Sequence, residues 1–102
     1  MMAEAFANAL ILTGPTGSGK SRLALELAGR LGAEVVSMDS MALYRHMDVG
    51  TAKPGPEDRR RVPHHLIDVL DPWESATVAW WLGRAAACCR DVEARGKRAL
   101  LV

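Results

Sequence analysis

A glycine-rich loop between an apolar run and a Lys-Ser pair constrains this chain more than any other feature. Residues 8–21 read NALILTGPTGSGKS and satisfy the pattern G-x-x-x-x-G-K-[ST]. Residues 10–12 predict a short buried strand, and apolar residues recur at helical spacing over 19–31 until Gly32, which predicts a helix that ends there. The apolar positions of this helix are Leu23, Leu27, Ala28 and Leu31. Strand, glycine loop and helix in this order open a phosphate-binding α/β unit.

The chemistry of the loop follows from its residue types. Glycines let successive backbone amides turn toward phosphate oxygens, and the N-terminus of the following helix adds a positive dipole end. Lys20 adds a charge, and the Ser21 hydroxyl is suited to bind Mg²⁺. The expected phosphate-binding residues are Gly14, Pro15, Thr16, Gly17, Ser18, Gly19, Lys20 and Ser21. The pattern indicates a phosphorylated ligand without identifying it, because the loop binds phosphate oxygens and no base.

Further elements follow along the chain. Val35 and Val36 predict a second strand, with Asp39 placed where that strand gives way to a loop. Glycines and prolines between Ser40 and Pro63 favour irregular chain, and loops of this length are commonly functional. Residues 65–70 predict a short third strand.

A long helix and a last strand complete the pattern. Ser75 is a plausible N-cap for a helix that runs to about Arg95 and ends at Gly96. Its apolar stripe consists of Val78, Trp81, Leu82, Ala85, Cys88 or Cys89, and Val92. Residues 99–102 predict another strand, exposed because nothing follows it, so we expect residues 1–102 to be the N-terminal part of a longer domain.

Composition narrows the class of protein. The formal net charge of +1 gives no bulk attraction for nucleic acid. The N-terminus carries Glu4 and no basic segment, and no apolar run approaches the roughly 18 residues of a membrane span. Cys88 and Cys89 are adjacent in a predicted helix, which favours reduced thiols and a cytoplasmic protein.

The predicted fold is a P-loop NTPase-like three-layer α/β fold with a mainly parallel sheet. A monomer is favoured.

Two segments beyond the loop resemble a known family. SMDSMALYRHMDVGTAKP at residues 37–54 and PHHLIDVLDP at residues 63–72 closely resemble the tRNA dimethylallyltransferases, also called tRNA isopentenyltransferases. The resemblance extends over residues 9–102. It implies transfer of a dimethylallyl group from dimethylallyl diphosphate to the N6 amine of an adenine beside the anticodon of a tRNA.

The resemblance also implies roles for single residues. The loop holds the diphosphate leaving group with Mg²⁺ at Ser21, and Asp39 bonds the attacking amine and accepts its proton. Asp39, Ser40, Met41 and Ala42 match the stretch that lies against the anticodon arm of the tRNA. In the family, three features follow the strand that begins here at Ala99: a Gly-Gly-Thr motif, an arginine that grips the diphosphate, and a helical tRNA-binding region. Residues 1–102 contain none of these, so we expect them to have little transferase activity alone.

Two other functions stay open. In a small-molecule or nucleotide kinase that uses ATP, Asp39 serves as a Mg²⁺ ligand or as a base for an acceptor hydroxyl. A non-enzymatic phosphate-binding or RNA-contacting module is the third hypothesis. Asp39 also has a purely structural alternative, because aspartates after strands often cap a turn.

Several polar and aromatic residues have open or structural interpretations. Contact with RNA phosphate or ribose is open for Tyr44, Arg45, Thr51 and Lys53. For Thr51 and Lys53, stabilisation of the loop is an equal alternative. The basic run Arg59, Arg60 and Arg61 is typical of a solvated face. His64 and His65 point to opposite faces of a strand and are expected to be structural. Trp73, Trp80 and Trp81 are expected to pack rather than stack on bases.

Overall fold

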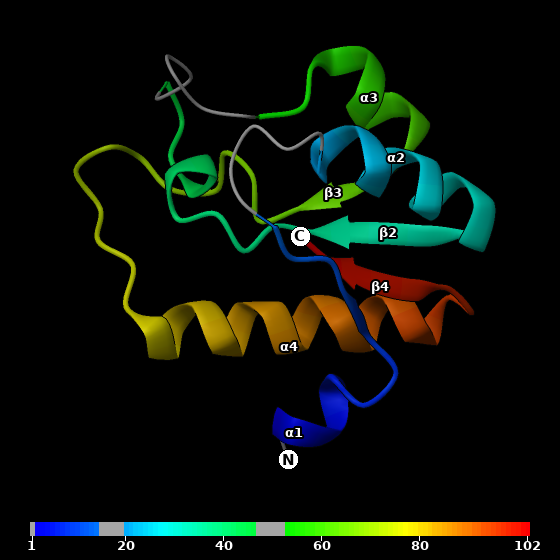
Figure 1. Ribbon diagram of the computed structural model, residues 1–102. Helices are drawn as coiled ribbons and strands as arrows, with labels where there is room; N and C mark the ends of the chain where they lie inside the picture. The colour runs from blue at the N-terminus through cyan, green and yellow to red at the C-terminus, as the bar shows by residue number, and fades with distance from the viewer. Residues whose placement is uncertain (1, 15–19, 47–52) are drawn as a thin grey trace.

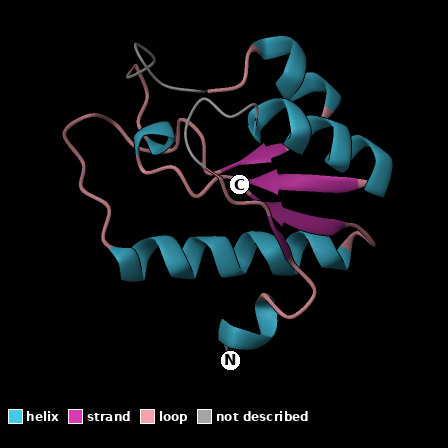
Figure 2. Cartoon of the chain, viewed as in Figure 1, coloured by secondary structure: helices cyan, strands magenta, loops and turns pink. Residues whose placement is uncertain are grey.

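The computed structural model describes residues 2–14, 20–46 and 53–102, and these form a parallel β-sheet between two layers of helices. The strands are β1 (Leu10–Ile11), β2 (Ala33–Val36), β3 (His64–His65) and β4 (Arg98–Leu101), in the order β1-β4-β2-β3. The helices are α1 (Met2–Ala5), α2 (Lys20–Leu31), the 3-10 helix η1 (Met41–Leu43), α3 (Pro56–Arg61) and α4 (Val78–Ala94). Figure 1 shows α2 and α3 on one face of the sheet and α4 with α1 on the other, and Figure 2 shows the same layers by element type. The predicted three-layer fold is confirmed.

Strand β4 lies inside the sheet, between β1 and β2. It pairs in parallel with both, through Leu10 with Leu100 and Val36 with Leu101. The prediction that this strand is exposed is wrong, because the crossover through α4 inserts it between the first two strands, where Leu100 and Leu101 are buried.

Alternation along the strands divides the core into two clusters. Val35 and Leu100 pack against α2, whereas Val36 and Leu101 pack against α4. Neighbouring residues of a strand point to opposite faces, so two-residue apolar runs suffice to supply both layers.

Helix α2 meets the sheet through small residues. Ala24 and Ala28 are buried, whereas the predicted stripe residues Leu23 and Leu31 are 46% and 44% exposed. Small side chains let the helix axis approach the strands, which turns the contact face away from the leucines. The predicted end of the helix at Gly32 is confirmed, since Gly32 adopts the left-handed conformation with φ 62°.

The stretch predicted to be irregular contains helix α3. Gly55 precedes it as N-cap and Pro56 occupies the first turn, where a missing N–H costs nothing. Acidic residues fill the first turn and the run Arg59–Arg61 fills the last, which matches the helix dipole at both ends. Local charge placement stabilises this short helix without an apolar stripe, so periodicity could not reveal it.

The third strand is shorter than predicted and begins one residue earlier. It covers His64 and His65 only, because Leu66 and Asp68 both adopt left-handed conformations, with φ 64° and 56°. The chain therefore turns where residues 65–70 were expected to stay extended.

Helix α4 begins at Val78, with Thr77 as its N-cap in place of the predicted Ser75. The Thr77 side chain accepts a hydrogen bond from the Trp80 amide at 3.0 Å. Val78, predicted to lie on the apolar stripe, is 77% exposed, whereas the later stripe positions Ala85, Cys89 and Val92 are buried as predicted. The predicted cap Gly96 is confirmed by its φ of 77°.

Each helix of the described residues is too short or too polar to cross a lipid bilayer.

Candidate phosphate-binding and catalytic site

The candidate site lies at the carboxyl edge of the parallel sheet. Backbone pairing continues past the strand ends, with the Leu12 amide bonded to the Leu101 carbonyl at 2.8 Å and the Met38 amide to the Val102 carbonyl at 2.7 Å. The segments that follow β1 and β2 therefore leave the sheet on either side of β4. Parallel α/β sheets bind ligands outside this edge.

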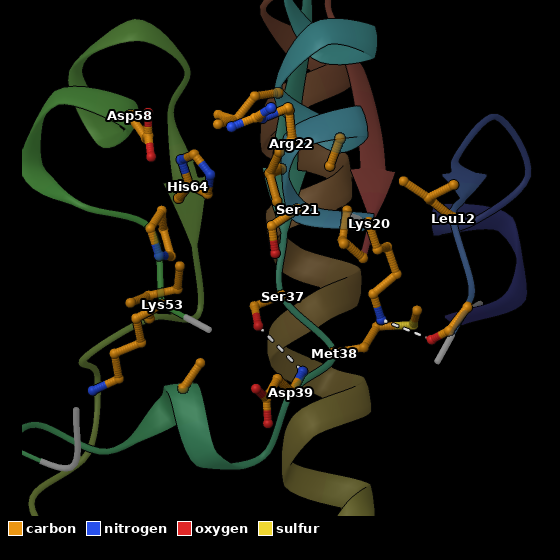
Figure 3. A pocket seen from close by; sticks show the side chains of 18 of the residues that line it. Leu12, Lys20, Ser21, Arg22, Ser37, Met38, Asp39, Lys53, Asp58 and His64 are labelled. Atoms are coloured by element: carbon orange, nitrogen blue, oxygen red, sulfur yellow. Dashed lines mark hydrogen bonds between the residues drawn. The ribbon is translucent and has the colours of Figure 1, made fainter. Parts of the chain in front are cut away.

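A cavity of about 1230 Å³ opens there (Figure 3). Its walls come from the end of β1, the start of α2, the segment after β2, and the region of α3 and β3. Among its lining residues are Gly14, Lys20, Ser21, Ser37, Asp39, Met41 and Ala42. The cavity thus joins the predicted phosphate-binding residues to the predicted catalytic carboxylate.

The described ends of the phosphate loop contact each other. The Lys20 ammonium lies 3.4 Å from the Gly14 carbonyl oxygen, and Lys20 is the first residue of α2. The helix N-terminus and the ammonium therefore place positive charge together at the mouth of the loop. Five predicted phosphate-binding residues, Pro15, Thr16, Gly17, Ser18 and Gly19, lie outside the described residues.

Asp39 begins a turn that fixes its side chain. Its Oδ1 accepts a hydrogen bond from the Met41 amide at 2.9 Å, and its own amide donates to the Ser37 hydroxyl at 3.2 Å. The structural role considered for Asp39 is therefore present. Its Oδ2 has no hydrogen-bond donor among the described residues, which leaves one carboxylate oxygen for a ligand.

The other three residues predicted to contact tRNA differ in exposure. Ser40 and Met41 are exposed beside Asp39. Ala42 is 4% exposed, although it still lines the cavity, and its carbonyl accepts a hydrogen bond from the Asp68 amide at 2.9 Å. Only the first two offer side chains that protrude from the surface.

The donors at this edge can be tested against a magnesium ion. Ser21 and Asp39 contribute hydroxyl and carboxylate oxygens to the same cavity, and oxygen ligands are those that Mg²⁺ prefers. Within residues 2–14, 20–46 and 53–102, no group of three or more His, Cys, Asp or Glu side chains could hold a metal. Since Mg²⁺ commonly keeps waters and binds through substrate phosphates, this donor set fits an ion that arrives with a diphosphate.

Two of the four residues considered for RNA contact form ion pairs that hold the loop. The guanidinium of Arg45 bonds the Asp71 carboxylate at 2.9 Å. Lys53 bonds the Tyr44 carbonyl and the Asp68 carboxylate. Thr51 lies outside the described residues.

The arginines of the basic run on α3 make different contacts. Arg59 pairs with the second oxygen of Asp68 at 3.0 Å, and Arg61 lines the cavity. All three arginines are exposed, as predicted for the run.

The two histidines of β3 make separate contacts, as their strand positions predict. His64 Nδ1 lies 2.7 Å from the Val62 carbonyl, and His65 Nε2 lies 2.7 Å from a carboxylate oxygen of Glu34. Burial lowers the pKa of His64, which favours its neutral form at pH 7. Because a carbonyl only accepts, the proton of that neutral ring is assigned to Nδ1.

Glu34 is a buried charge that the sequence did not single out. Its side chain is 1% exposed and bonds both His65 and the Arg95 guanidinium. Burial alone would raise the pKa of Glu34, but the bonds from Arg95 and His65 overcome this and lower it. Arg95 lies 61 positions along the chain, so no local pattern could have revealed the cluster.

Two of the three tryptophans pack against the core, and the third is exposed. Trp81 packs against the α4-side cluster and donates from its indole to the Ser37 carbonyl. Trp80 is half-buried with the Arg84 guanidinium 5.4 Å from its ring centre. Trp73 is 81% exposed, so the prediction that it packs is wrong for the described residues.

Together, the parallel sheet, the strand that leads into Gly14, and Lys20 at the start of α2 define a P-loop α/β protein. Two family models match the chain, IPP transferase over residues 42–102 and isopentenyl transferase over residues 7–67. The chain belongs to the IPP transferase family.

Individual relatives agree with this assignment. The tRNA dimethylallyltransferase of Geobacter metallireducens is 57% identical over 93 residues, which is 91% of this chain and 30% of that protein. The crystal structure of the tRNA isopentenylpyrophosphate transferase of Bacillus halodurans matches with a TM-score of 0.87 and 45% identity, over 93% of this chain and 32% of that one. A eukaryotic dimethylallyltransferase, described as acting on tRNA, matches with a TM-score of 0.87 and 30% identity, over 92% and 23% of the two chains. The chain thus spans about 30% of the length of the curated relative it matches here.

Proposed function

We propose that the protein containing these residues transfers a dimethylallyl group from dimethylallyl diphosphate to the N6 amine of an adenosine beside the anticodon of a tRNA. The observation that carries this proposal is that the two ends of the phosphate loop and Asp39 line one cavity. The names of the relatives, which are tRNA dimethylallyltransferases and tRNA isopentenylpyrophosphate transferases, support it.

The loop side of the cavity suits a departing diphosphate. Negative charge builds on the leaving oxygen as its bond to carbon breaks, and preorganised positive charge stabilises it. Lys20 and the N-terminus of α2 stand at this place. A Mg²⁺ ion held at Ser21 would add Lewis-acid stabilisation of the same oxygens.

The Asp39 side suits the incoming amine. The N6 nitrogen forms a bond to the first carbon of the dimethylallyl group, and the electron pair of the broken carbon–oxygen bond leaves with the diphosphate. The nitrogen gains positive charge in this step, so its proton passes to the Asp39 carboxylate. Because Oδ1 is held by the Met41 amide, Oδ2 is the oxygen we assign to the amine, with Ser40, Met41 and Ala42 against the tRNA.

We propose that residues 1–102 form the phosphate-loop part of the transferase domain. The relatives are about three times as long, and tRNA is large compared with the cavity described here. We expect residues 1–102 alone to show little transfer of a radiolabelled dimethylallyl group. Normal turnover by these residues alone would contradict this division of the domain.

A kinase that uses ATP is the alternative function, and one titration distinguishes it from a dimethylallyltransferase. We expect the full-length protein, with Mg²⁺, to bind dimethylallyl diphosphate more tightly than ATP and to transfer the radiolabel to tRNA. Tight ATP binding with phosphoryl transfer, and no prenyl transfer, would contradict the proposed function.

A further inference from the structure

The ammonium of Lys53 connects two loops beside the cavity. Its side chain is 8% exposed, and its Nζ lies 2.6 Å from the Tyr44 carbonyl oxygen and 2.8 Å from Asp68 Oδ1. The first contact belongs to the segment after β2, and the second to the turn after β3. A charged donor at these distances makes two strong hydrogen bonds.

Asp68 is the counter-ion of the Lys53 ammonium, and its backbone and its other contacts hold it in place. It adopts a left-handed conformation, with φ 56°, and its second carboxylate oxygen bonds Arg59 at 3.0 Å. Burial opposes ionisation of Asp68, but the bonds from Lys53 and Arg59 outweigh it and lower the pKa of this carboxyl. Asp68 is therefore a carboxylate at neutral pH, which compensates the nearly buried ammonium.

The backbone around Asp68 also supports the segment that carries Asp39. The Asp68 amide donates to the Ala42 carbonyl at 2.9 Å, and the Val69 amide donates to the Leu43 carbonyl at 2.9 Å. The turn after β3 is thus a scaffold on which η1 rests, and Lys53 binds the end of that 3-10 helix to the same scaffold.

A short path of bonds leads from Lys53 to the Asp39 carboxylate. Lys53 Nζ bonds the Tyr44 carbonyl, the Tyr44 amide bonds the Met41 carbonyl at 3.4 Å, and the Met41 amide bonds Asp39 Oδ1 at 2.9 Å. If the Tyr44 end of η1 moves, the turn that aims the carboxylate moves with it.

We propose that Lys53 is a positioning residue, which fixes the Asp39 carboxylate toward the cavity by tying Tyr44 to Asp68, rather than a ligand of the tRNA or diphosphate. This inference rests on the proposed function of Asp39. An ammonium enclosed by a carbonyl and a carboxylate serves the loop, and small displacements of a catalytic group reduce rate far more than they reduce substrate affinity.

The test compares Lys53→Met with Asp68→Asn and the double variant in the full-length protein. We expect Lys53→Met to slow single-turnover transfer at saturating substrates by about 100-fold, with little change in the affinities for dimethylallyl diphosphate and tRNA. Asp68→Asn should also slow transfer. The two losses in rate should not multiply in the double variant, because both variants break the same contact between Lys53 and Asp68. Lys97→Met removes an exposed lysine and should leave the rate unchanged.

A second measurement does not depend on activity. In Lys53→Met, hydrogen exchange at the Met41 and Tyr44 amides should accelerate, whereas exchange in β2 and β4 should not. If Lys53→Met fails to fold, Asp68→Asn alone gives both measurements. Weakened substrate binding with an unchanged rate constant, multiplicative losses or unchanged exchange would overturn the inference. A wild-type protein that transfers nothing would instead contradict the proposed function.

Discussion

The Trp81 indole Nε1 donates a hydrogen bond to the Ser37 carbonyl oxygen at a distance of 3.1 Å. The bond joins helix α4 to the segment that follows β2, on which Asp39 lies two residues later. The Ser37 hydroxyl in turn accepts the Asp39 amide. Helix α4 therefore supports the side of the cavity that Asp39 lines.

Trp81→Phe tests this support. Phenylalanine keeps most of the packing and removes one donor to a half-buried carbonyl, so we expect a loss of about 1 kcal/mol in the free energy of unfolding. Urea denaturation of the full-length variant measures the loss. The matched change Trp73→Phe, at a side chain that is 81% exposed, should have almost no effect; equal losses in the two variants would contradict a role for the indole bond.

The His65–Glu34 contact makes stability depend on pH. A hydrogen bond with Cys88 raises the pKa of His65, burial opposes this, and the contact with Glu34 raises it further. A group whose pKa is raised by folding stabilises the fold fully below its ordinary value of 6.5, and this contribution disappears as pH rises through the raised value.

The corresponding measurement is urea denaturation of wild type and His65→Gln at a series of pH values. We expect the stability advantage of the wild type to be largest below pH 6.5 and to shrink as the pH rises above it. The lowered pKa of Glu34 has the opposite sign, so its contribution should be lost only as pH falls below 4.5. If the stability advantage of the wild type instead grew as the pH rose above 6.5, folding would not stabilise His65 as a cation.

The two adjacent cysteines should differ in reactivity. Burial raises the pKa of Cys89 to about 11, whereas the Cys88 side chain is half-buried. Alkylation requires the thiolate, so iodoacetamide at pH 8 should modify Cys88 well before Cys89, as followed by mass spectrometry of the Cys88→Ala and Cys89→Ala variants. Equal rates would contradict the burial of Cys89 in the folded protein.

Much of the fold could be predicted because its signals are local. The β1–loop–α2 unit, the end of α2 at Gly32 and the end of α4 at Gly96 each depend on residues adjacent in sequence. Helix α3 was missed because helix-dipole charges rather than an apolar stripe stabilise it. The third strand was predicted too long because apolar residues continue past His65. The chain turns at Leu66 and Asp68, which adopt left-handed conformations, and the Asp68 amide bonds η1.

The residues of the candidate site could be predicted only in part. The loop pattern located Gly14, Lys20 and Ser21, and the family resemblance located Asp39; all four line one cavity. Contacts between distant segments were not predictable from local pattern. Lys53 meets Asp68 across 15 positions and Arg95 meets Glu34 across 61, and such pairs exist only once the sheet order has brought the loops together.

The central claim is a division of labour between Lys20 and Asp39 in prenyl transfer. Asp39→Asn is the sharper variant for the carboxylate, because an amide oxygen still accepts the Met41 amide and keeps the turn. Lys20→Ala removes the charge at the loop. Both changes alter one group and leave the core intact.

The most direct measurement is dimethylallyl diphosphate affinity and single-turnover transfer to tRNA for both variants of the full-length protein. We predict that Asp39→Asn abolishes transfer with affinity nearly unchanged, and that Lys20→Ala chiefly weakens diphosphate binding. Normal transfer by Asp39→Asn together with lost diphosphate affinity would contradict the account.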